Sequence, residues 1–374
     1  DPAGWRGGVS NPGDDVGRYT AIVENAGMYH IAYYDRTNGA LKMASGSPGG
    51  SWAIHVVDDT DDSGRHASMV LGVDGAPIVA YMRVGTDGSG HTTGSVVVAT
   101  AITTTPASTA DWSFAIVASK ELPCRAAACA TGTVCLESGE CAAPTDDCAS
   151  ACKNTEACVL GECQTTIGAN FVEDWAPAIG YYASLARTPT GLALTYYDRT
   201  NGTLYGARYD GAAWGTPFTI DGYESGVDGA GDSGIGSSLF VDQNDVWHIA
   251  YADGSSESLK YARIDGLVVT RSVVDDGTGD GTQTFSDGRH VVGDDTAIVV
   301  TADGGVRIVY QDASAHQTRI AALVNGADVW SRSVLSSPGS HEGFWLNQLV
   351  TGNDTLVIGW WRGNGNSKDN GLRV

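Results

Sequence analysis

A pattern that recurs about every 50 residues organises this chain of 374 residues. Each copy reads as a strand, a Gly-containing turn, a second strand of the type "HIAYYD", a turn, a third strand containing Leu, and a fourth strand that begins with Trp. One aromatic residue near the end of the second strand marks each copy: Tyr33, Tyr81, Tyr196, Tyr251, Tyr310 and Trp360. The intervals between these markers are 48, 115, 55, 59 and 50 residues, so one insertion interrupts six copies.

Four short strands are expected in each copy. The second copy shows them as "ASMVLGV", "PIVAYM", "GSVVVATA" and "WSFAIVA", whose apolar runs are typical of strands buried on one or both faces. A unit of this size cannot bury both faces alone, whereas units stacked around an axis bury a continuous core. The sequence therefore predicts an all-β, six-bladed β-propeller with four-stranded blades.

The two ends of the chain predict how the propeller closes. The last copy stops at Gly371–Val374 after three strands, and residues 1–19 match residues 49–66, so that Trp5 takes the place of Trp52. We expect this N-terminal strand to complete the last blade, because an open sheet edge is a template for aggregation. The predicted division is blades 1 and 2 with the closing strand in 1–120, the insertion in 121–175, and blades 3–6 in 176–374.

The insertion carries every cysteine of the chain. Two consecutive quartets both end in Gly-Glu-Cys: Cys124, Cys129, Cys135, Cys141 and then Cys148, Cys152, Cys158, Cys163. An even count with no paired His favours four disulfides over zinc, although the spacing leaves their connectivity open. Disulfides persist in oxidising compartments, so we expect a secreted or cell-surface protein.

The charge balance limits the partners. The chain has 22 Lys+Arg against 44 Asp+Glu, a formal net charge of −22. Nucleic acids and anionic membranes require a concentrated positive surface, so neither is expected as a partner. The sequence contains no run of about 18 apolar residues, so no membrane span is expected. We expect a monomer that binds a glycan or another extracellular ligand.

One face of the predicted propeller gathers the candidate functional residues. The loops that enter the first strands of the blades lie on this face, together with the loops that follow the second strands. Several of the entering loops end in Gly-Arg followed by Tyr or His. Alignment on the first strand places Tyr19, His66, Tyr181, Gly236 and Trp345 at the channel mouth. The candidates for acid–base catalysis are His66, Tyr19, Tyr181 and His290. The candidates for ligand binding are Arg65, Arg83, Arg289, Arg36, Arg199, Trp345 and His341.

A structural interpretation competes with the functional one at two of these arginines. Arg36 and Arg199 lie in the sequences "DRTNG" at 35–39 and 198–202, where Asn-Gly is typical of a hairpin turn with positive φ. In that case each Arg would form a salt bridge with a neighbouring blade. His30 and His248 lie inside strands, where a buried structural role is expected.

No cofactor is required by any motif. Acidic, Gly-rich loops at 228–232 and 276–280 offer the oxygen ligands that calcium needs, but their spacing is equally that of solvated loops. A transition metal held by His66, His290 and His341 is a weaker alternative, because no two of these residues have ligand-like spacing.

The "HIAYYD…NG.L..A…W" repeat resembles those of extracellular bacterial propellers of the sialidase-like or BNR-like type. Some members are polysaccharide lyases with His, Tyr and Arg in the central pocket, so the resemblance implies that architecture and that kind of site. The sialidase Asp-box is absent, so sialidase activity is not implied. The Cys-rich insertion is similar to short modules in surface proteins of myxobacteria-like organisms, which implies a location.

Two functions follow from these observations. The first is a ligand-binding module for a glycan, a peptide or a cation at the face that contains Tyr19, His66 and Tyr181. The alternative is a polysaccharide-degrading enzyme, a lyase in which His and Tyr move protons while Arg recognises the carboxylate. The sequence leaves open whether the protein is an enzyme.

Overall fold

The computed structural model describes residues 13–86, 92–121, 129–136, 140–166, 177–227, 231–278, 288–327, 329–336, 341–363 and 371–374. Three expectations from the sequence lie wholly or partly outside these residues. They are the closing strand with Trp5, the cysteine Cys124, and large parts of the acidic loops at 228–232 and 276–280.

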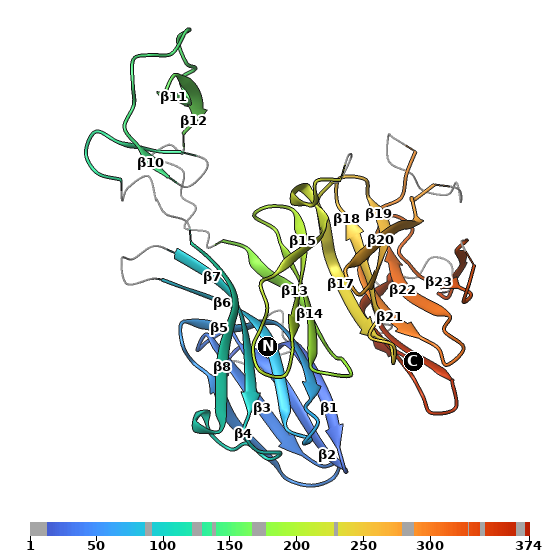
Figure 1. The fold of residues 1–374 in the computed structure, drawn as a ribbon. Helices are drawn as coiled ribbons and strands as arrows, with labels where there is room; N and C mark the ends of the chain where they lie inside the picture. The colour runs from blue at the N-terminus through green and yellow to red at the C-terminus, as the bar shows by residue number, and fades with distance from the viewer. Residues whose placement is uncertain are drawn as a thin grey trace, which may run out of the picture.

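The predicted six-bladed propeller is confirmed (Figure 1). Each blade is an antiparallel sheet whose strands follow one another in chain order. Blade 1 contains β1 (Val16–Asn25), β2 (Met28–Asp35), β3 (Ala40–Gly46) and β4 (Trp52–Asp58). Blade 2 contains β5 (Asp62–Leu71), β6 (Pro77–Thr86), β7 (Thr92–Ala101) and β8 (Trp112–Glu121), with the short helix η1 (Thr109–Asp111) before β8. Blade 3 contains β13 (Ile179–Arg187), β14 (Leu192–Asp198), β15 (Thr203–Tyr209) and β16 (Phe218–Gly222), followed by η2 (Tyr223–Ser225).

The second half of the chain repeats this plan. Blade 4 contains β17 (Ser233–Val241), β18 (Trp247–Asp253), β19 (Ser258–Asp265) and β20 (Val268–Asp275). Blade 5 contains β21 (Val292–Val300), β22 (Val306–Asp312), β23 (Gln317–Leu323) and β24 (Ser331–Val334). Blade 6 has three described strands, β25 (His341–Val350), β26 (Leu356–Gly363) and β27 (Gly371–Arg373). No helix in the described parts of the chain is long and apolar enough to cross a membrane.

The insertion between β8 and β13 forms two small hairpins, drawn in green in Figure 1. They pair β9 (Val134–Cys135) with β10 (Cys141–Ala142) and β11 (Glu156–Val159) with β12 (Glu162–Thr165). Three disulfides hold this segment: Cys129–Cys141, Cys148–Cys158 and Cys152–Cys163. Cys135 is also disulfide-bonded. The prediction of disulfides rather than zinc is confirmed for the described cysteines.

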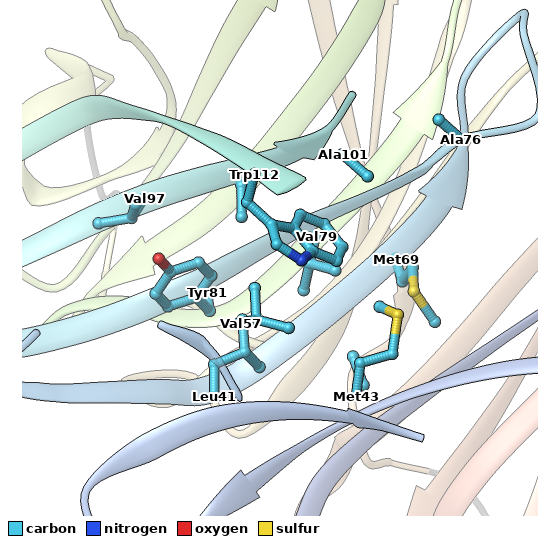
Figure 2. Packing of buried hydrophobic residues seen from close by; sticks show 12 residues of the cluster. Leu41, Met43, Val57, Met69, Ala76, Val79, Tyr81, Val97, Ala101 and Trp112 are labelled. Atoms are coloured by element: carbon cyan, nitrogen blue, oxygen red, sulfur yellow. The ribbon is translucent and has the colours of Figure 1, made fainter. Parts of the chain in front are cut away.

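Apolar side chains at the junctions between blades build the core. Figure 2 shows the junction of blades 1 and 2, where Leu41, Met43 and Val57 pack against Tyr81 and Trp112. Similar buried clusters join blade 2 to 3, 3 to 4 and 4 to 5. Blades 2 to 4 thus bury both faces, one against each neighbour, which explains why their inner strands read as nearly continuous apolar runs.

Blades 1 and 6 are the two ends of this series. Ile22 and Ile54 of blade 1 are 57% and 63% exposed, and Leu349 of blade 6 is 54% exposed. Polar contacts join blade 6 to blade 5, such as the hydrogen bond that the Gln348 side-chain amide donates to the carbonyl of Arg307 (2.9 Å). The described core is therefore densest in blades 1–5.

The two "DRTNG" segments form hairpin turns. Gly39 and Gly202 adopt φ of 61° and 57°, a left-handed conformation that costs glycine little. The Asp35 carboxylate accepts the amide N–H of Asn38 (3.1 Å), and the Asp198 carboxylate accepts that of Thr200 (2.9 Å). The turn interpretation of these segments is therefore confirmed, and glycine alone carries the positive φ.

Candidate functional site

A bulge at the start of every first strand builds the mouth of the propeller. Each bulge begins with a glycine at positive φ: Gly17, Gly64, Gly180, Gly234, Gly293 and Gly343. The pairing register with the second strand shifts at this point in all six blades. Two residues further on stands the mouth position, occupied in chain order by Tyr19, His66, Tyr182, Gly236, Asp295 and Trp345. A bulge redirects a side chain, and five of these positions share a left-handed backbone, whereas Asp295 of blade 5 does not.

This arrangement corrects two expectations. The residue of blade 3 with the left-handed backbone of Tyr19 and His66 is Tyr182 (φ 50°), not Tyr181. In blade 5 the mouth position belongs to Asp295, which the sequence alignment missed. The segment "GRH" that ends at His290 imitates the "GRY" and "GRH" of blades 1 and 2, but the bulge glycine of blade 5 is Gly293. Aligning "VGDDTA" with "SGRHAS" would have found Asp295.

Backbone strain marks the mouth position. Tyr19, His66, Tyr182 and Trp345 have φ of 51°, 52°, 50° and 52°. Non-glycine residues in this conformation pay about 1–2 kcal/mol relative to the right-handed one. Blade 4 has glycine here, Gly236 with φ 60°. Four blades therefore hold a ring-bearing side chain at a position where glycine would be less strained.

The rings of blades 1–3 touch one another. We call Tyr19, His66, Tyr181 and Tyr182 the aromatic cluster. The His66 ring centroid lies 4.4 Å from that of Tyr19, 4.6 Å from that of Tyr181 and 5.1 Å from that of Tyr182. Tyr19 is 41% exposed, and the other three are half-buried. The structure thus brings together three of the four predicted acid–base candidates and adds Tyr182.

Two further tyrosines hold the cluster at its ends. Tyr34 lies 6.1 Å from Tyr19 and donates its hydroxyl hydrogen bond to Asp62 (2.6 Å). Tyr197 lies 6.3 Å from Tyr182 and donates in the same way to Asp232 (2.5 Å). These hydrogen bonds fix the outer rings, which restricts the orientation of the aromatic cluster between them.

The environment of His66 keeps its ring neutral at pH 7. Burial, with a smaller contribution from the positive charge of Arg65, lowers the pKa of His66 to about 4. Burial, with the negative charges of Asp294 and Asp295, raises the pKa of the Tyr182 hydroxyl. A neutral imidazole beside protonated phenols offers ring faces and hydrogen-bonding atoms rather than charge.

Blade 5 supplies two carboxylates on the other side of Gly236. A Cβ on Gly236 would lie 2.4 Å from the Asp294 carbonyl oxygen, so glycine allows the backbone of blade 5 to approach closely. The Asp295 carboxylate accepts the amide N–H of Leu346 (3.1 Å). Burial raises the pKa of Asp295 to about 6, although backbone hydrogen bonds from Leu346 and Trp345 oppose the shift. Asp294 is exposed.

Trp345 lies beside this acidic side of the mouth. Its side chain is 76% exposed, and its ring centroid is 6.2 Å from that of Trp361. The predicted ligand-binding residue Trp345 occupies a mouth position.

The predicted arginines divide into two groups. Arg65 forms an ion pair with Asp62 and lies over the Tyr34 ring at 5.5 Å, beside the aromatic cluster. Arg83 binds the buried Asp58 instead, between blades 1 and 2. Arg36 is exposed and lies 3.6 Å from Asp15, which precedes β1 of the same blade, so the expected salt bridge to a neighbouring blade is not found there. Arg199 is exposed on its turn, and Arg289 is half-buried.

The predicted histidines lie apart. His290 is 1% exposed and its Nδ1 is 2.8 Å from the Asp312 carboxylate. His341 is exposed, with its ring 4.5 Å from that of His316. His66 contacts Tyr19, Tyr181 and Tyr182. The three histidines proposed for a transition metal therefore do not form a common cluster. In the described residues, the one group of three potential metal ligands is Cys148, Cys152 and Cys163, whose sulfurs are in disulfides.

Sequence reasoning missed a second set of polar residues, buried between blades. Tyr251 donates its hydroxyl hydrogen bond to Asp221 (2.7 Å), and Tyr310 donates to Asp275 (2.7 Å), each across a blade junction. At the junction of blades 1 and 2, Tyr81 and Arg83 both bind Asp58. Burial would raise the pKa of Asp58, but these hydrogen bonds outweigh burial and hold it below its usual value.

No family model and no curated protein matches the chain. Solved structures that match the chain include a polysaccharide lyase described as a PL25 ulvan lyase, at 11% identity and a TM-score of 0.44, covering 94% of this chain and 81% of that one. An endo-arabinase from Bacteroides thetaiotaomicron matches at 11% identity and a TM-score of 0.40, covering 95% and 92%. A thermostable family-43 glycoside hydrolase matches at 12% identity and a TM-score of 0.39, covering 87% and 94%.

Proposed function

We propose that this protein is a secreted or cell-surface ligand-binding module that holds a glycan in the mouth of its propeller. The observation that carries the proposal is the retention of Tyr19, His66, Tyr182 and Trp345 in a strained left-handed conformation. Strain of this kind persists where the side chain is required, and binding sites are the usual place for it. A repeat built only for stability would favour glycine, as blade 4 has at Gly236.

The chemistry of the mouth suits a hydroxylated ring. Sugar rings present C–H faces that pack on Tyr, His and Trp rings, and hydroxyl groups that need fixed donors and acceptors. The phenols of Tyr19, Tyr181 and Tyr182, the neutral imidazole of His66 and the carboxylate of Asp294 supply both. The hydrogen-bonded Tyr34 and Tyr197 orient the neighbouring rings, which reduces the entropy lost on binding.

One observation favours the lyase alternative. His66 is held neutral and contacts three tyrosines, so its imidazole offers a lone pair to a proton, although a pKa of about 4 makes it a weak base at pH 7. A lyase must also neutralise the uronate carboxylate, and the arginine beside His66 is already paired with Asp62. The carboxylates of blade 5 add further negative charge. Binding without elimination is thus the better-supported function.

A glycan-binding panel followed by calorimetry tests the proposal. We expect soluble oligosaccharides to bind the wild-type protein, and the Tyr19→Ala and His66→Ala variants to bind at least about 10-fold more weakly, corresponding to about 1.4 kcal/mol. Phe114→Ala is the matched control, because Phe114 is a 42% exposed aromatic residue on the outer strand β8. Equal affinity of the wild-type and both mouth variants would refute the site.

The same panel separates binding from elimination. Uronate-containing polysaccharides are incubated with the protein while the absorbance of an unsaturated product is followed. The proposal expects no increase with any of them. If the absorbance increases with the wild type but not with His66→Ala, the protein is a lyase rather than a binding module.

A further inference from the structure

The mouth is chemically asymmetric, and this asymmetry indicates the kind of ligand. Blades 1–3 contribute the aromatic cluster, whereas blade 5 contributes Asp294 and Asp295 and blade 6 contributes Trp345. Gly236 of blade 4 has no side chain to separate the two halves, and the backbone of Asp294 approaches it closely. The Ser237 hydroxyl, next to Gly236, donates to the Tyr182 carbonyl (3.0 Å), which ties blade 4 to the aromatic half.

The two halves are close enough to interact. The negative charges of Asp294 and Asp295 act on the Tyr182 hydroxyl, and so do the neighbouring Tyr19 and Tyr181. Tyr182 and Asp294 also flank the same segment of blade 4, because the Tyr182 carbonyl accepts the Ser237 hydroxyl and the Asp294 carbonyl oxygen lies against Gly236. On the far side of Asp295, the adjacent Trp345 presents a ring that is 76% exposed.

Three arginines of blades 1 and 2 are already engaged in ion pairs. Arg65 is ion-paired with Asp62, and Arg18 is ion-paired with Asp15 (2.8 Å). Arg83 is paired with Asp58 between the blades. Asp294 is exposed, so its negative charge faces the solvent that a ligand must displace. The whole chain adds to this field with a net charge of −22.

Aromatic faces combined with carboxylates are the arrangement that binds a positively charged nitrogen. A cation over Tyr or Trp is attracted by the ring quadrupole, and quaternary ammonium groups are recognised in cages of such rings. A uronate would be repelled by Asp294, and a neutral sugar would offer that carboxylate hydroxyl hydrogen bonds but no opposite charge. We infer that the preferred ligand of the mouth is a glycan bearing a cationic nitrogen, with the charged group between the aromatic cluster and Asp294. This inference rests on the proposed glycan-binding function.

Two oligosaccharides of the same length and linkage test the inference by calorimetry. One is built from N-trimethylglucosamine, which carries a permanent positive charge, and the other from N-acetylglucosamine. We expect the cationic oligomer to bind at least about 10-fold more tightly. In Asp294→Asn this preference should fall to about threefold or less. Asp303→Asn is the matched control, because Asp303 is an exposed carboxylate on the turn that follows β21 at the opposite end of the blade.

The outcomes separate the inference from the function on which it rests. If both oligomers bind equally, or if Asp294→Asn and Asp303→Asn reduce the preference alike, the inference is wrong while glycan binding stands. If neither oligomer binds, tetramethylammonium is tested by saturation-transfer NMR. If tetramethylammonium binds and Asp294→Asn weakens this binding, the mouth is a site for cations but not for glycans. No binding of any of these probes would overturn both.

Discussion

The junctions between blades and the mouth of the propeller use similar residue types in opposite ways. At the junctions, Tyr81, Tyr251 and Tyr310 repeat one role, each donating to a buried Asp of the preceding blade. At the mouth, the backbone bulge repeats but the residue it carries changes from Tyr to His, Gly, Asp and Trp. The residues that repeat from blade to blade are thus those that pack between blades, whereas the residues that vary are those of the candidate site.

This difference has an energetic basis. A buried carboxylate with several donors is stabilising only when its network is complete, so each junction constrains its residues tightly. A half-exposed position in a bulge constrains the backbone but leaves the side chain free to vary. Substitutions at the junctions should therefore change the free energy of unfolding, whereas substitutions at the mouth should mainly change binding.

The largest effect is expected at Asp221. This carboxylate is 1% exposed and accepts from Tyr251, Ser233 and Lys260. Asp221→Ala leaves these donors without their acceptor and should lower the free energy of unfolding by about 3–5 kcal/mol, measured by urea denaturation. The control is Asp265→Ala, which removes a surface ion pair with Arg263 and should cost at most about 0.5 kcal/mol. If both variants lost the same free energy of unfolding, the buried carboxylate at the junction would be no more important for stability than a surface ion pair.

The second-largest effect distinguishes the junction of blades 3 and 4 from the junction of blades 2 and 3. Tyr251→Phe removes the hydroxyl that binds Asp221 and should cost about 1–2 kcal/mol of unfolding free energy. Tyr196 is the equivalent residue of blade 3, but it stacks on Tyr205 at 5.6 Å, and Lys120 near the end of β8 pairs with Asp198. Tyr196→Phe should therefore cost clearly less. Comparable midpoints of denaturation for both variants would contradict the comparison.

Trp345 tests the strain at the mouth. Both Trp345→Gly and Trp345→Ala remove an exposed ring, but only glycine relaxes the left-handed backbone at φ 52°. We expect the Gly variant to be more stable than the Ala variant by about 1 kcal/mol in thermal or urea unfolding. Both variants should lose affinity for the cationic oligosaccharide. An Ala variant as stable as the Gly variant would show that the mouth position is not strained.

The smallest effect is expected from Asp295 and depends on pH. Its pKa is raised to about 6, so the folded state keeps the proton that the unfolded state loses at a lower pH. Stability contributed by the protonated form is therefore lost as the pH rises toward 6. Asp295→Asn has no such loss and should be more stable than the wild type by about 0.5–1 kcal/mol at pH 8, allowing for partial exposure.

The control for Asp295 is the same comparison in acid. At about pH 4 and below, the carboxyl group is increasingly protonated in both states, so the difference between variant and wild type should vanish. A difference that is independent of pH would mean that the variant acts through packing or hydrogen bonds. A wild type that is more stable than Asp295→Asn at pH 8 would contradict the assigned direction of the pKa shift.

The sequence predicted the fold more fully than the site. Period and strand pattern were sufficient for six blades, because each blade repeats the same apolar spacing. The residues of the mouth could not be predicted without the position of the bulge, because a shift of one residue decides whether Tyr181 or Tyr182 takes the left-handed conformation. His290 shows the same limit, since its "GRH" context imitates blade 2 yet it is buried beside Asp312.

Arg83 and Asp58 show why contacts between blades were hidden. They lie 25 residues apart and in different repeats, and nothing in either local pattern indicates that they form an ion pair. The arginine looked like a loop residue available to a ligand. Only the stacking of blade 2 on blade 1 placed the carboxylate beside it.

The sequence by itself determined the blade repeat, the position of the disulfide-rich insertion and the acidity of the chain, because these depend on spacing and composition along the chain. The tertiary structure decided which side chains share the mouth and which carboxylates are buried at the junctions. That division has a physical reason: strand patterns are local, whereas the rings of the aromatic cluster come from three blades and touch only when the bulged first strands are packed side by side.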